Sequence, residues 1–320
     1  MADELDLLRA ANPAPTDGPY YGDGPLDQHA ERRLRRLLHT PAPRRRLIWG
    51  LAVAATVAAT VAGLLLGGPT VAPAVAAPRP LVVRAESTPV TLAELAGRAR
   101  AAADGAPALR KGTHVQSWSM GMSDDKPPIT LPEERVVRWR ADAGHTELVV
   151  ATDPRRPGRP VLTDDDGAPH AVHDGHVLSD RTYPPSWSDA PPNARPPRDV
   201  AGLRAYLQET AYRDSALTTS ELLDAVQELL DHWTLGGAES AALARLLADT
   251  GGLRPAGQVT DRLGRPGQAY VCAGSGTTRR LLIMDATTGA VLGLETTFTR
   301  PDPRYGVKAG DVMDYSAWMR

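Results

Sequence analysis

The sequence contains very little cysteine and lysine. Among its 320 residues there is one cysteine, Cys272, and there are 3 lysines against 33 arginines. A single cysteine excludes an intramolecular disulfide and a zinc site built from several thiolates. Cys272 stands in the apolar run 269–273, which predicts a buried strand residue, with a reactive thiol as the alternative. The formal net charge of -2 gives no overall basic field, so we expect no direct binding of nucleic acid.

Short motifs of known catalytic chemistry are absent as well. We find no phosphate-binding G-x-x-x-x-G-K loop, no G-x-S-x-G elbow, no H-E-x-x-H pair and no dinucleotide fingerprint. Gly274-Ser275-Gly276 comes nearest to an elbow, but it lacks the outer glycines and fits a turn between strands. The sequence therefore predicts neither an enzyme nor a bound cofactor. An envelope hydrolase whose site resembles no short motif is the least favoured alternative.

Residues 47–66 form an uncharged apolar run, LIWGLAVAATVAATVAGLLL. A helix of about 20 residues is about 30 Å long, the thickness of a bilayer core, so the run predicts a single transmembrane helix. Seven arginines lie between residues 32 and 46, but only Arg79 and Arg84 follow closely, which places the N-terminus in the cytoplasm. The alternatives are a signal peptide cleaved after Ala74-Val75-Ala76 and a buried helix of a soluble protein.

Residues 1–46 are then a cytoplasmic tail, and residues 26–39 within it have the periodicity of an amphipathic helix. One interpretation is a basic helix that lies on anionic lipid. The other is a docking helix for a cytosolic protein. The residues expected to make the contact in the second case are Leu34, Leu37 and Leu38 on the apolar face and Arg32, Arg33, Arg35 and Arg36 beside it.

The remainder of the chain predicts a Pro/Ala-rich linker over residues 67–89 and an exported domain over residues 90–320. Runs of strand and helix signals in this domain indicate an α+β fold, with an antiparallel sheet packed on several helices. Helices are expected after the capping residues Thr91, Asp199 and Thr218 and over 239–249. Strands are expected over 114–120, 135–141, 146–152, 160–163, 169–173, 258–263, 268–273, 279–285 and 290–299.

An apolar stripe runs along the helix expected after Thr218 and ends at Trp233. The sheet must cover it, and Trp118, Met120 and Trp139 are the strand residues that we expect to face it. Methionine and tryptophan suit a concave apolar surface. The sequence thus allows either a closed core or a pocket for an apolar or lipid-like ligand lined by these residues.

The three histidines His170, His173 and His176 form the one histidine cluster of the chain. Residues three apart in a strand face opposite sides, so a regular strand does not direct all three at one metal ion. A bend at Asp174-Gly175 would change this. The acidic run 164–166 fits a hairpin turn, since the other ligands of a calcium loop are not spaced correctly. We therefore predict solvated loop residues and no metal site.

Several sequence blocks stand out along the chain. They are 4–9 with Asn12-Pro13, the arginine-flanked span, 257–261 with Gly264-Arg265, 281–285, Thr288-Gly289 and 291–293. These blocks resemble a family of actinobacterial single-pass membrane proteins that are typically encoded beside extracytoplasmic-function sigma factors. The resemblance implies a regulator related to anti-sigma factors, but the chain departs from zinc-type anti-sigma domains because residues 1–46 contain no cysteine. More distantly, the exported domain is similar to lipoprotein-carrier-like half-barrels.

Together these features predict a membrane-tethered regulatory or sensor protein. Its exported domain would sense a signal in the envelope, and its tail would engage a cytosolic partner such as a sigma factor. The alternative is an envelope binding protein for an apolar or lipid-like ligand with a passive membrane anchor.

Overall fold

The computed structural model describes residues 78–123, 127–140, 144–185 and 194–319. The tail 1–46 and the predicted span 47–66 lie outside these residues. Within the described part of the chain, no helix is long and apolar enough to cross a bilayer. All described residues belong to one compact unit, which comprises residues 69–320.

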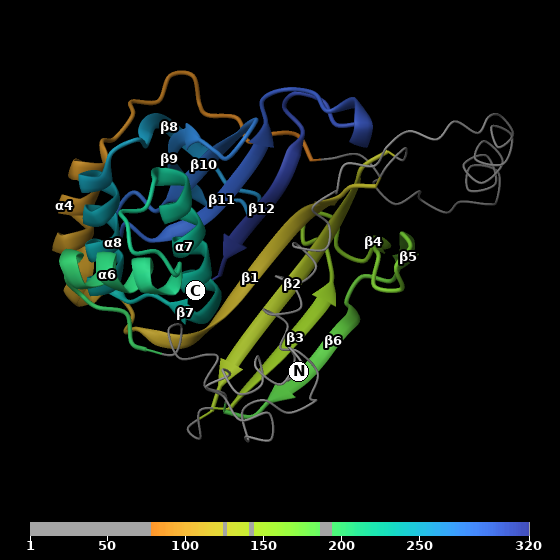
Figure 1. Ribbon diagram of the computed structural model, residues 1–320, viewed down its shortest axis with the longest axis horizontal. Helices are drawn as coiled ribbons and strands as arrows, with labels where there is room; N and C mark the ends of the chain where they lie inside the picture. Colours follow the sequence, from red (N-terminus) through yellow and green to blue (C-terminus); the bar gives the residue numbers. More distant parts are fainter. Residues whose placement is uncertain (1–77, 124–126, 141–143, 186–193, 320) are drawn as a thin grey trace, which may run out of the picture. The chain divides into compact units, whose positions relative to one another are not determined.

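A ten-stranded antiparallel sheet is the main element of this unit (Figure 1). Nine strands follow the order β6-β3-β2-β1-β12-β11-β10-β9-β8, and the short β7 pairs with one end of β1. A separate two-stranded ribbon is formed by β4 and β5. The strands are β1 (Arg110–Gly121), β2 (Ile129–Trp139), β3 (His145–Ala151), β4 (Val161–Thr163), β5 (His170–Val172), β6 (His176–Tyr183), β7 (Trp233–Thr234), β8 (Arg254–Thr260), β9 (Pro266–Ala273), β10 (Thr278–Met284), β11 (Val291–Phe298) and β12 (Val312–Trp318).

Three of the described helices begin directly after the predicted capping residues, and the fourth begins at Gly237, two residues before its expected start. Thr91 and Thr218 each form a complete capping box, and the Asp199 carboxylate accepts a hydrogen bond from the backbone of Gly202 at 2.8 Å. These side chains satisfy backbone N–H groups that the first helical turn leaves without partners. The helices are α4 (Leu92–Ala102), α6 (Val200–Thr210), α7 (Thr219–His232) and α8 (Gly237–Thr250).

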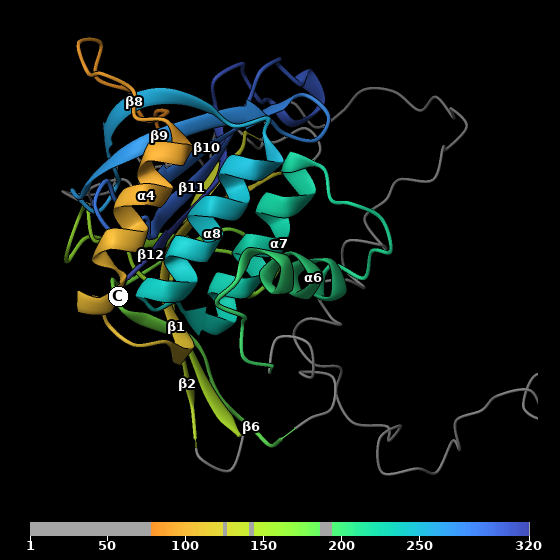
Figure 2. The same ribbon diagram turned by 90° about the vertical axis from the view of Figure 1, so that its left-hand side faces the viewer.

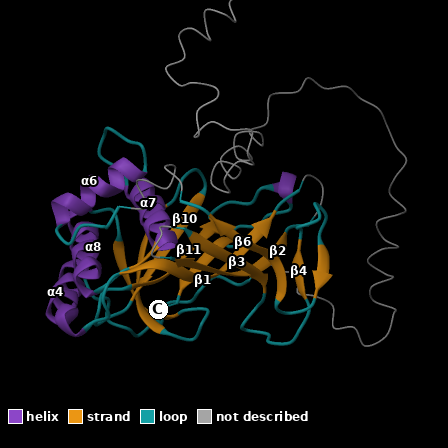
Figure 3. Ribbon diagram, turned by 90° about the horizontal axis from the view of Figure 1, so that it is seen from below, coloured by secondary structure: helices purple, strands orange, loops and turns teal. Residues whose placement is uncertain are grey.

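All four helices cover one face of the sheet at the end formed by β8 to β12 (Figures 2 and 3). The predicted stripe of α7 is buried there, with Leu223 and Leu229 almost fully inaccessible. It packs with Leu282 and Trp318 of the sheet in one large apolar core. The prediction of an α+β fold with an antiparallel sheet packed on helices is confirmed.

A second, smaller core covers the opposite face of the sheet. It contains Trp118, Ile283 and Tyr315, whose side chains are almost completely buried. Leu81 and Val83, from the chain segment before α4, pack against it. The sheet therefore buries apolar side chains on both faces at this end.

The segment 78–89 is part of the fold, although the sequence analysis assigns it to the linker. The backbone N–H of Leu81 donates to Glu295 Oε1 at 2.9 Å, and that of Arg84 donates to the carbonyl of Gln258 at 2.8 Å. These bonds fasten the segment to β8 and β11. The folded unit thus begins before residue 90.

Two long strands, β6 and β12, were not predicted. In β12 the apolar pattern is interrupted by Asp314, whose carboxylate accepts a hydrogen bond from the Thr296 hydroxyl at 3.1 Å. Burial raises the pKa of Asp314 despite this bond. In β6, Val177 is exposed and most other residues are polar. Both strands therefore form because they pair with neighbouring strands of the sheet, since their local sequence pattern does not indicate a strand.

A buried ion pair between Arg262 and Glu295 joins the segment 78–89 to the second core. The side chains are 5% and 1% exposed, respectively. Burial raises the pKa of Glu295, and the Arg262 charge opposes that rise. Arg262 Nη2 also donates to the carbonyl of Arg79 at 2.9 Å. The pair is therefore the centre of a buried polar network.

Replacing Glu295 by methionine leaves the Arg262 guanidinium buried without its carboxylate. We expect Glu295→Met to lower the free energy of unfolding by about 3 to 5 kcal/mol, the usual cost of breaking a buried pair on one side. The double variant Arg262→Met/Glu295→Met removes both charges and should recover most of the loss. Chemical denaturation of the three proteins measures the difference. A double variant as unstable as the single one would contradict this account.

Candidate functional site

A cleft of about 340 Å³ opens beside the second core. Its walls come from four parts of the chain: the first described residues, the start of β2, the loop between β3 and β4, and β4 itself. Pro132 of β2 is paired with Trp118, so the cleft lies on the sheet face opposite the helices. The lining residues are Pro78, Arg79, Thr130, Pro132, Asp153, Arg155, Arg156, Pro160, Val161 and Leu162.

The loop after β3 is folded by two aspartates. The carbonyl of Asp153 accepts a turn hydrogen bond from the backbone of Arg156 at 2.8 Å. Asp174 clamps the loop from outside, because its carboxylate accepts from the Thr152 hydroxyl at 2.6 Å and from the Gly158 backbone at 2.7 Å. Aspartate commonly organises turns in this way through its short carboxylate. The loop that carries the cleft arginines is therefore held at both ends.

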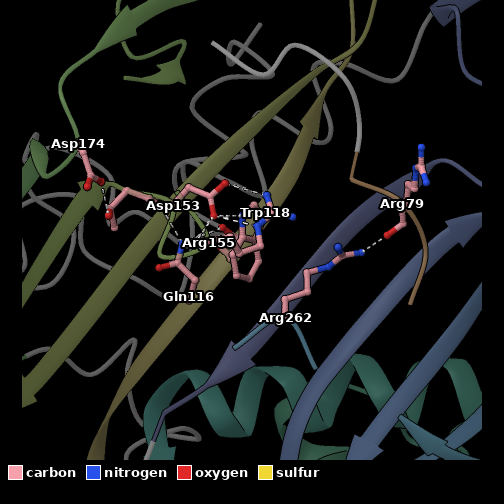
Figure 4. Close-up of polar contacts among 9 residues, drawn as sticks. Arg79, Gln116, Trp118, Asp153, Arg155, Asp174 and Arg262 are labelled. Carbon is pink, nitrogen blue, oxygen red and sulfur yellow. Dashed lines mark hydrogen bonds and ion pairs between the residues drawn. The ribbon is translucent and has the colours of Figure 1, made fainter. Parts of the chain in front are cut away.

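Trp118 lies next to the cleft residues Asp153 and Arg155 (Figure 4). Its indole Nε1 donates to Asp153 Oδ1 at 3.3 Å, and the Arg155 guanidinium lies 4.9 Å from the centre of its ring. The neighbouring Gln116 donates to the carbonyl of Thr152 at 2.9 Å. These contacts form a hydrogen-bonded layer beside the cleft, and Trp118 connects this layer to the second core.

The buried Asp153 forms an ion pair with the partly exposed Arg155 in this layer. Arg155 Nη2 donates to Asp153 Oδ2 at 2.8 Å and Arg155 Nε donates to Oδ1 at 2.9 Å. The Asp153 side chain is 8% exposed. Burial alone would raise its pKa, but the bonds and charge of Arg155 outweigh burial and hold the pKa below its ordinary value. Asp153 is therefore ionised at neutral pH, and its carboxylate orients Arg155.

The cleft has an excess of positive charge. It holds three arginines and one carboxylate, and within the described residues neither Arg79 nor Arg156 is in an ion pair. Guanidinium groups bind carboxylate and phosphate oxygens through parallel hydrogen bonds. Pro132, Val161 and Leu162 add apolar wall beside these charges. The arrangement suits an anion that carries a small apolar group.

The four residues predicted to line an apolar pocket do not share one site. Trp118 and Met120 alternate with Val115 along β1, and Val115 belongs to the core under the helices whereas Trp118 belongs to the second core. The expectation that Trp118 and Met120 face the α7 stripe is therefore wrong, since strand neighbours point to opposite faces. Only Trp139 and Trp233 come together, with Lys111 Nζ 3.4 Å and 5.9 Å from their ring centres.

The space between α7 and the sheet is filled by core side chains. A void beside Trp233 has a volume of about 20 Å³, with Leu230, Ser240 and Trp318 among its walls. A void of this size holds roughly one water molecule. It is too small for a lipid-like ligand. Of the two alternatives for the apolar stripe of α7, the closed core therefore fits this region and the ligand pocket does not.

The remaining predicted residues have separate outcomes. Cys272 is buried, as predicted, and burial raises the pKa of its thiol, which disfavours the reactive thiolate. The tail residues fall within 1–77 and lie outside the described part of the chain. They are Arg32, Arg33, Leu34, Arg35, Arg36, Leu37 and Leu38.

The arginines of the cleft were not predicted from the sequence. The signal available was the stretch 153–160, DPRRPGRP, which places three arginines between two predicted strands. A loop so rich in one charge is a candidate for anion binding. The contribution of Arg79 had no local signal, because it depends on the docking of the segment 78–89 against the sheet.

Comparison with known proteins adds no functional assignment. No protein-family model matches the chain, and no curated protein matches it either. The resemblance to membrane proteins encoded beside sigma factors therefore stays a prediction. The cleft geometry is the basis for the function proposed below.

Asp153→Asn tests the charge of the buried carboxylate while keeping its shape. Because the folded-state pKa is lowered, the charge contributes stability above its unfolded pKa of about 3.9, and this is lost as the pH falls through the folded value. We expect the variant to lose about 1 to 3 kcal/mol at neutral pH and to converge with the wild type in acid. Thermal unfolding of both proteins, from acid to neutral pH, measures this difference in stability. The exposed Asp104→Asn is the control and should leave the stability at neutral pH almost unchanged.

Proposed function

We propose that this chain is a membrane-tethered sensor whose exported domain binds a small anion with an apolar portion in the arginine cleft. One observation carries the proposal: Pro78 and Arg79, which follow the predicted span 47–66 along the chain, form part of the cleft wall. A ligand in the cleft would therefore contact the segment that continues into the predicted span. The cleft volume falls in the range of about 300 to 1,000 Å³ that is usual for small-molecule sites.

Binding in this cleft would act on a specific contact. The carbonyl of Arg79 accepts a hydrogen bond from Arg262, which is paired with Glu295. A ligand held by Arg79 and Arg156 together would favour the state in which the segment is docked, because it binds that state more tightly. This difference in the ligand's affinity between the docked and the released states would couple ligand binding to the position of the segment, as a sensor requires.

The proposed sensor would cross the membrane once. The domain would be extracytoplasmic, with the N-terminus in the cytoplasm, as the arginine asymmetry around residues 47–66 predicts. Strands β1, β2, β3 and β6 extend past the helices (Figure 3), which is compatible with a half-barrel open on one side. In contrast to a carrier that holds lipid between helices and sheet, the ligand would bind on the opposite face.

The output of the sensor would be the cytoplasmic tail. Leu34, Leu37 and Leu38 would dock on a sigma factor, with the four neighbouring arginines adding charge. A passively anchored binding protein, the alternative, would use the same cleft but would need no tail partner. The two functions therefore make the same prediction for the cleft and different predictions for residues 1–46.

Arg156→Gln removes a cleft guanidinium that is exposed and takes part in no ion pair of the described residues. We expect it to weaken binding of para-trifluoromethylphenyl phosphate about tenfold, since one charge-assisted hydrogen bond contributes about 1.5 kcal/mol or more. Fluorine NMR titration of the full chain in nanodiscs of zwitterionic lipid measures the affinity. The neutral para-trifluoromethylbenzyl alcohol should bind much more weakly.

Arg159→Gln is the matched control for this titration. Arg159 lies in the same exposed loop but is not part of the cleft lining. It should leave the affinity for the phosphate probe almost unchanged. Equal losses in the two variants, or equal binding of the neutral probe, would contradict an anion site in the cleft.

The tail has its own test. Residues 1–46 fused to a carrier protein should retain an extracytoplasmic-function sigma factor from a lysate of the native host, identified by mass spectrometry. Replacing Leu34, Leu37 and Leu38 by serine should abolish this capture, whereas replacing the four arginines by glutamine should weaken it less at physiological salt, where charges are screened. If the wild-type tail retains no sigma factor, the passive anchor is the better description.

A further inference from the structure

The histidine cluster near the β4–β5 hairpin is gathered around one aspartate. His170 Nε2 lies 3.4 Å from Asp165 Oδ1, and His176 Nε2 lies 3.9 Å from Asp165 Oδ2. A second carboxylate, that of Asp166, has Oδ2 3.8 Å from His170 Nε2. From this geometry we propose a zinc-binding site formed by Asp165, Asp166, His170 and His176.

A bend in the chain makes this convergence possible. His170 opens β5, and a turn at Asp174 and Gly175 leads to His176 at the start of β6. Gly175 has a φ of 84°, which an L-residue with a side chain rarely adopts. A continuous strand would point residues three apart to opposite faces, which was the reason for predicting no metal site. His170 and His176 are six residues apart, and a continuous strand would separate them by about 20 Å. The turn shortens this separation, and both histidines face Asp165.

The separations of the ligand atoms fit one ion. Two ligands about 2.0 to 2.1 Å from a tetrahedral zinc ion lie about 3.4 Å from one another. The distance from His170 Nε2 to Asp165 Oδ1 equals this value, and the other two distances are slightly longer. The ligand atoms of Asp165, Asp166 and His170 all lie within 4.8 Å of one another, so these three need only small side-chain movements to coordinate one ion. His176 lies outside this group, and it would complete the site by a larger rotation toward Asp165.

Hydrogen bonds already orient the ligands. A carbonyl can only accept, so His170 Nδ1 carries the hydrogen that it donates to the Ala168 carbonyl at 3.1 Å. In the neutral ring this leaves the Nε2 lone pair directed at the carboxylates, where a metal ion would join them. The Thr163 hydroxyl donates to Asp165 Oδ1 at 3.2 Å. Ligating histidines and carboxylates are usually held by such outer contacts.

The ligand set selects the class of metal. Two imidazoles and two carboxylates suit Zn²⁺, whereas Mg²⁺ and Ca²⁺ favour sites made almost entirely of oxygen atoms. Two carboxylates also balance the charge of a divalent ion. The side chains of Asp165, His170 and His176 are between 31% and 37% exposed, which leaves a path for the ion.

The site also adjoins the arginine cleft through one strand. Thr163, which holds Asp165, belongs to β4, and the same strand contributes Val161 and Leu162 to the cleft wall. An ion bound by His170 and His176 would link β5 to β6 and so fix the ribbon that bears this wall. The metal site does not depend on the sensor function, since its ligands are outside the cleft lining.

The test is zinc binding by the full chain in zwitterionic nanodiscs, purified without a polyhistidine tag. Competition with a chromophoric chelator should reveal one site with a Kd of about 1 µM or tighter. Co²⁺ in place of zinc should give the intense visible absorption of tetrahedral coordination. His170→Ala and Asp165→Asn should each weaken zinc binding at least about tenfold. Their melting temperatures without metal should match the wild type, because the residues are at the surface.

His173→Ala is the matched control. His173 lies in the same turn and its ring contacts that of His176 edge-on, at 5.3 Å between centres, but it is not close to the carboxylates in the described contacts. It should retain the wild-type zinc affinity. The proposal is overturned if the wild type binds zinc no tighter than about 1 mM, if His170→Ala binds like the wild type, or if His173→Ala loses as much affinity as His170→Ala.

Discussion

The pairing of the last strand with the first is the constraint on which the rest of the structure depends. Strand β12 lies between β1 and β11, with Val115 opposite Trp318 and Trp118 opposite Tyr315. Without it, the strands that carry the cleft and the strands that carry the helices would be two separate sheets. Each of the two cores takes side chains from both β1 and β12. Because these strands are far apart in the sequence, closing the sheet is a slow, non-local step that needs the complete chain.

Arginine joins the layers around this sheet. Arg280 reaches from β10 to Asp224 of α7 at 2.6 Å, and Arg265 donates to the carbonyls of Leu292 and Trp318 as well as to Asp261. A planar guanidinium with five donors can satisfy several acceptors at once, which a lysine ammonium does less well. The abundance of arginine therefore has structural use. The cleft employs the same chemistry, with part of its donors directed outward.

Local sequence signals were sufficient for the helices and for the hairpins, and insufficient for the sites. The capping boxes at Thr91 and Thr218 act within one helical turn, so they can be recognised without knowledge of the fold. The face occupied by Trp118 depends on strand parity relative to the helices, which no local pattern specifies. The cleft needs the docking of the segment 78–89, and the gathering of His170 and His176 around Asp165 needs the turn at Gly175. The cleft, which is made from distant segments, was therefore invisible until the topology was known, whereas the bend at Asp174-Gly175 had a local signal in the sequence.

The segment before α4 has one more consequence, for the sheet border. β8 is the terminal strand of the sheet, and an open border strand invites pairing with other chains. At Gln258 both backbone groups are taken: its N–H donates to the Ser87 hydroxyl at 2.8 Å, and its carbonyl accepts from the Arg84 N–H. Leu81 and Val83 shield the apolar surface beside it. The segment that leads toward the predicted span thus protects β8 against pairing with other chains. A fragment that begins at residue 90 would leave the backbone groups of Gln258 unpaired and would be prone to self-association.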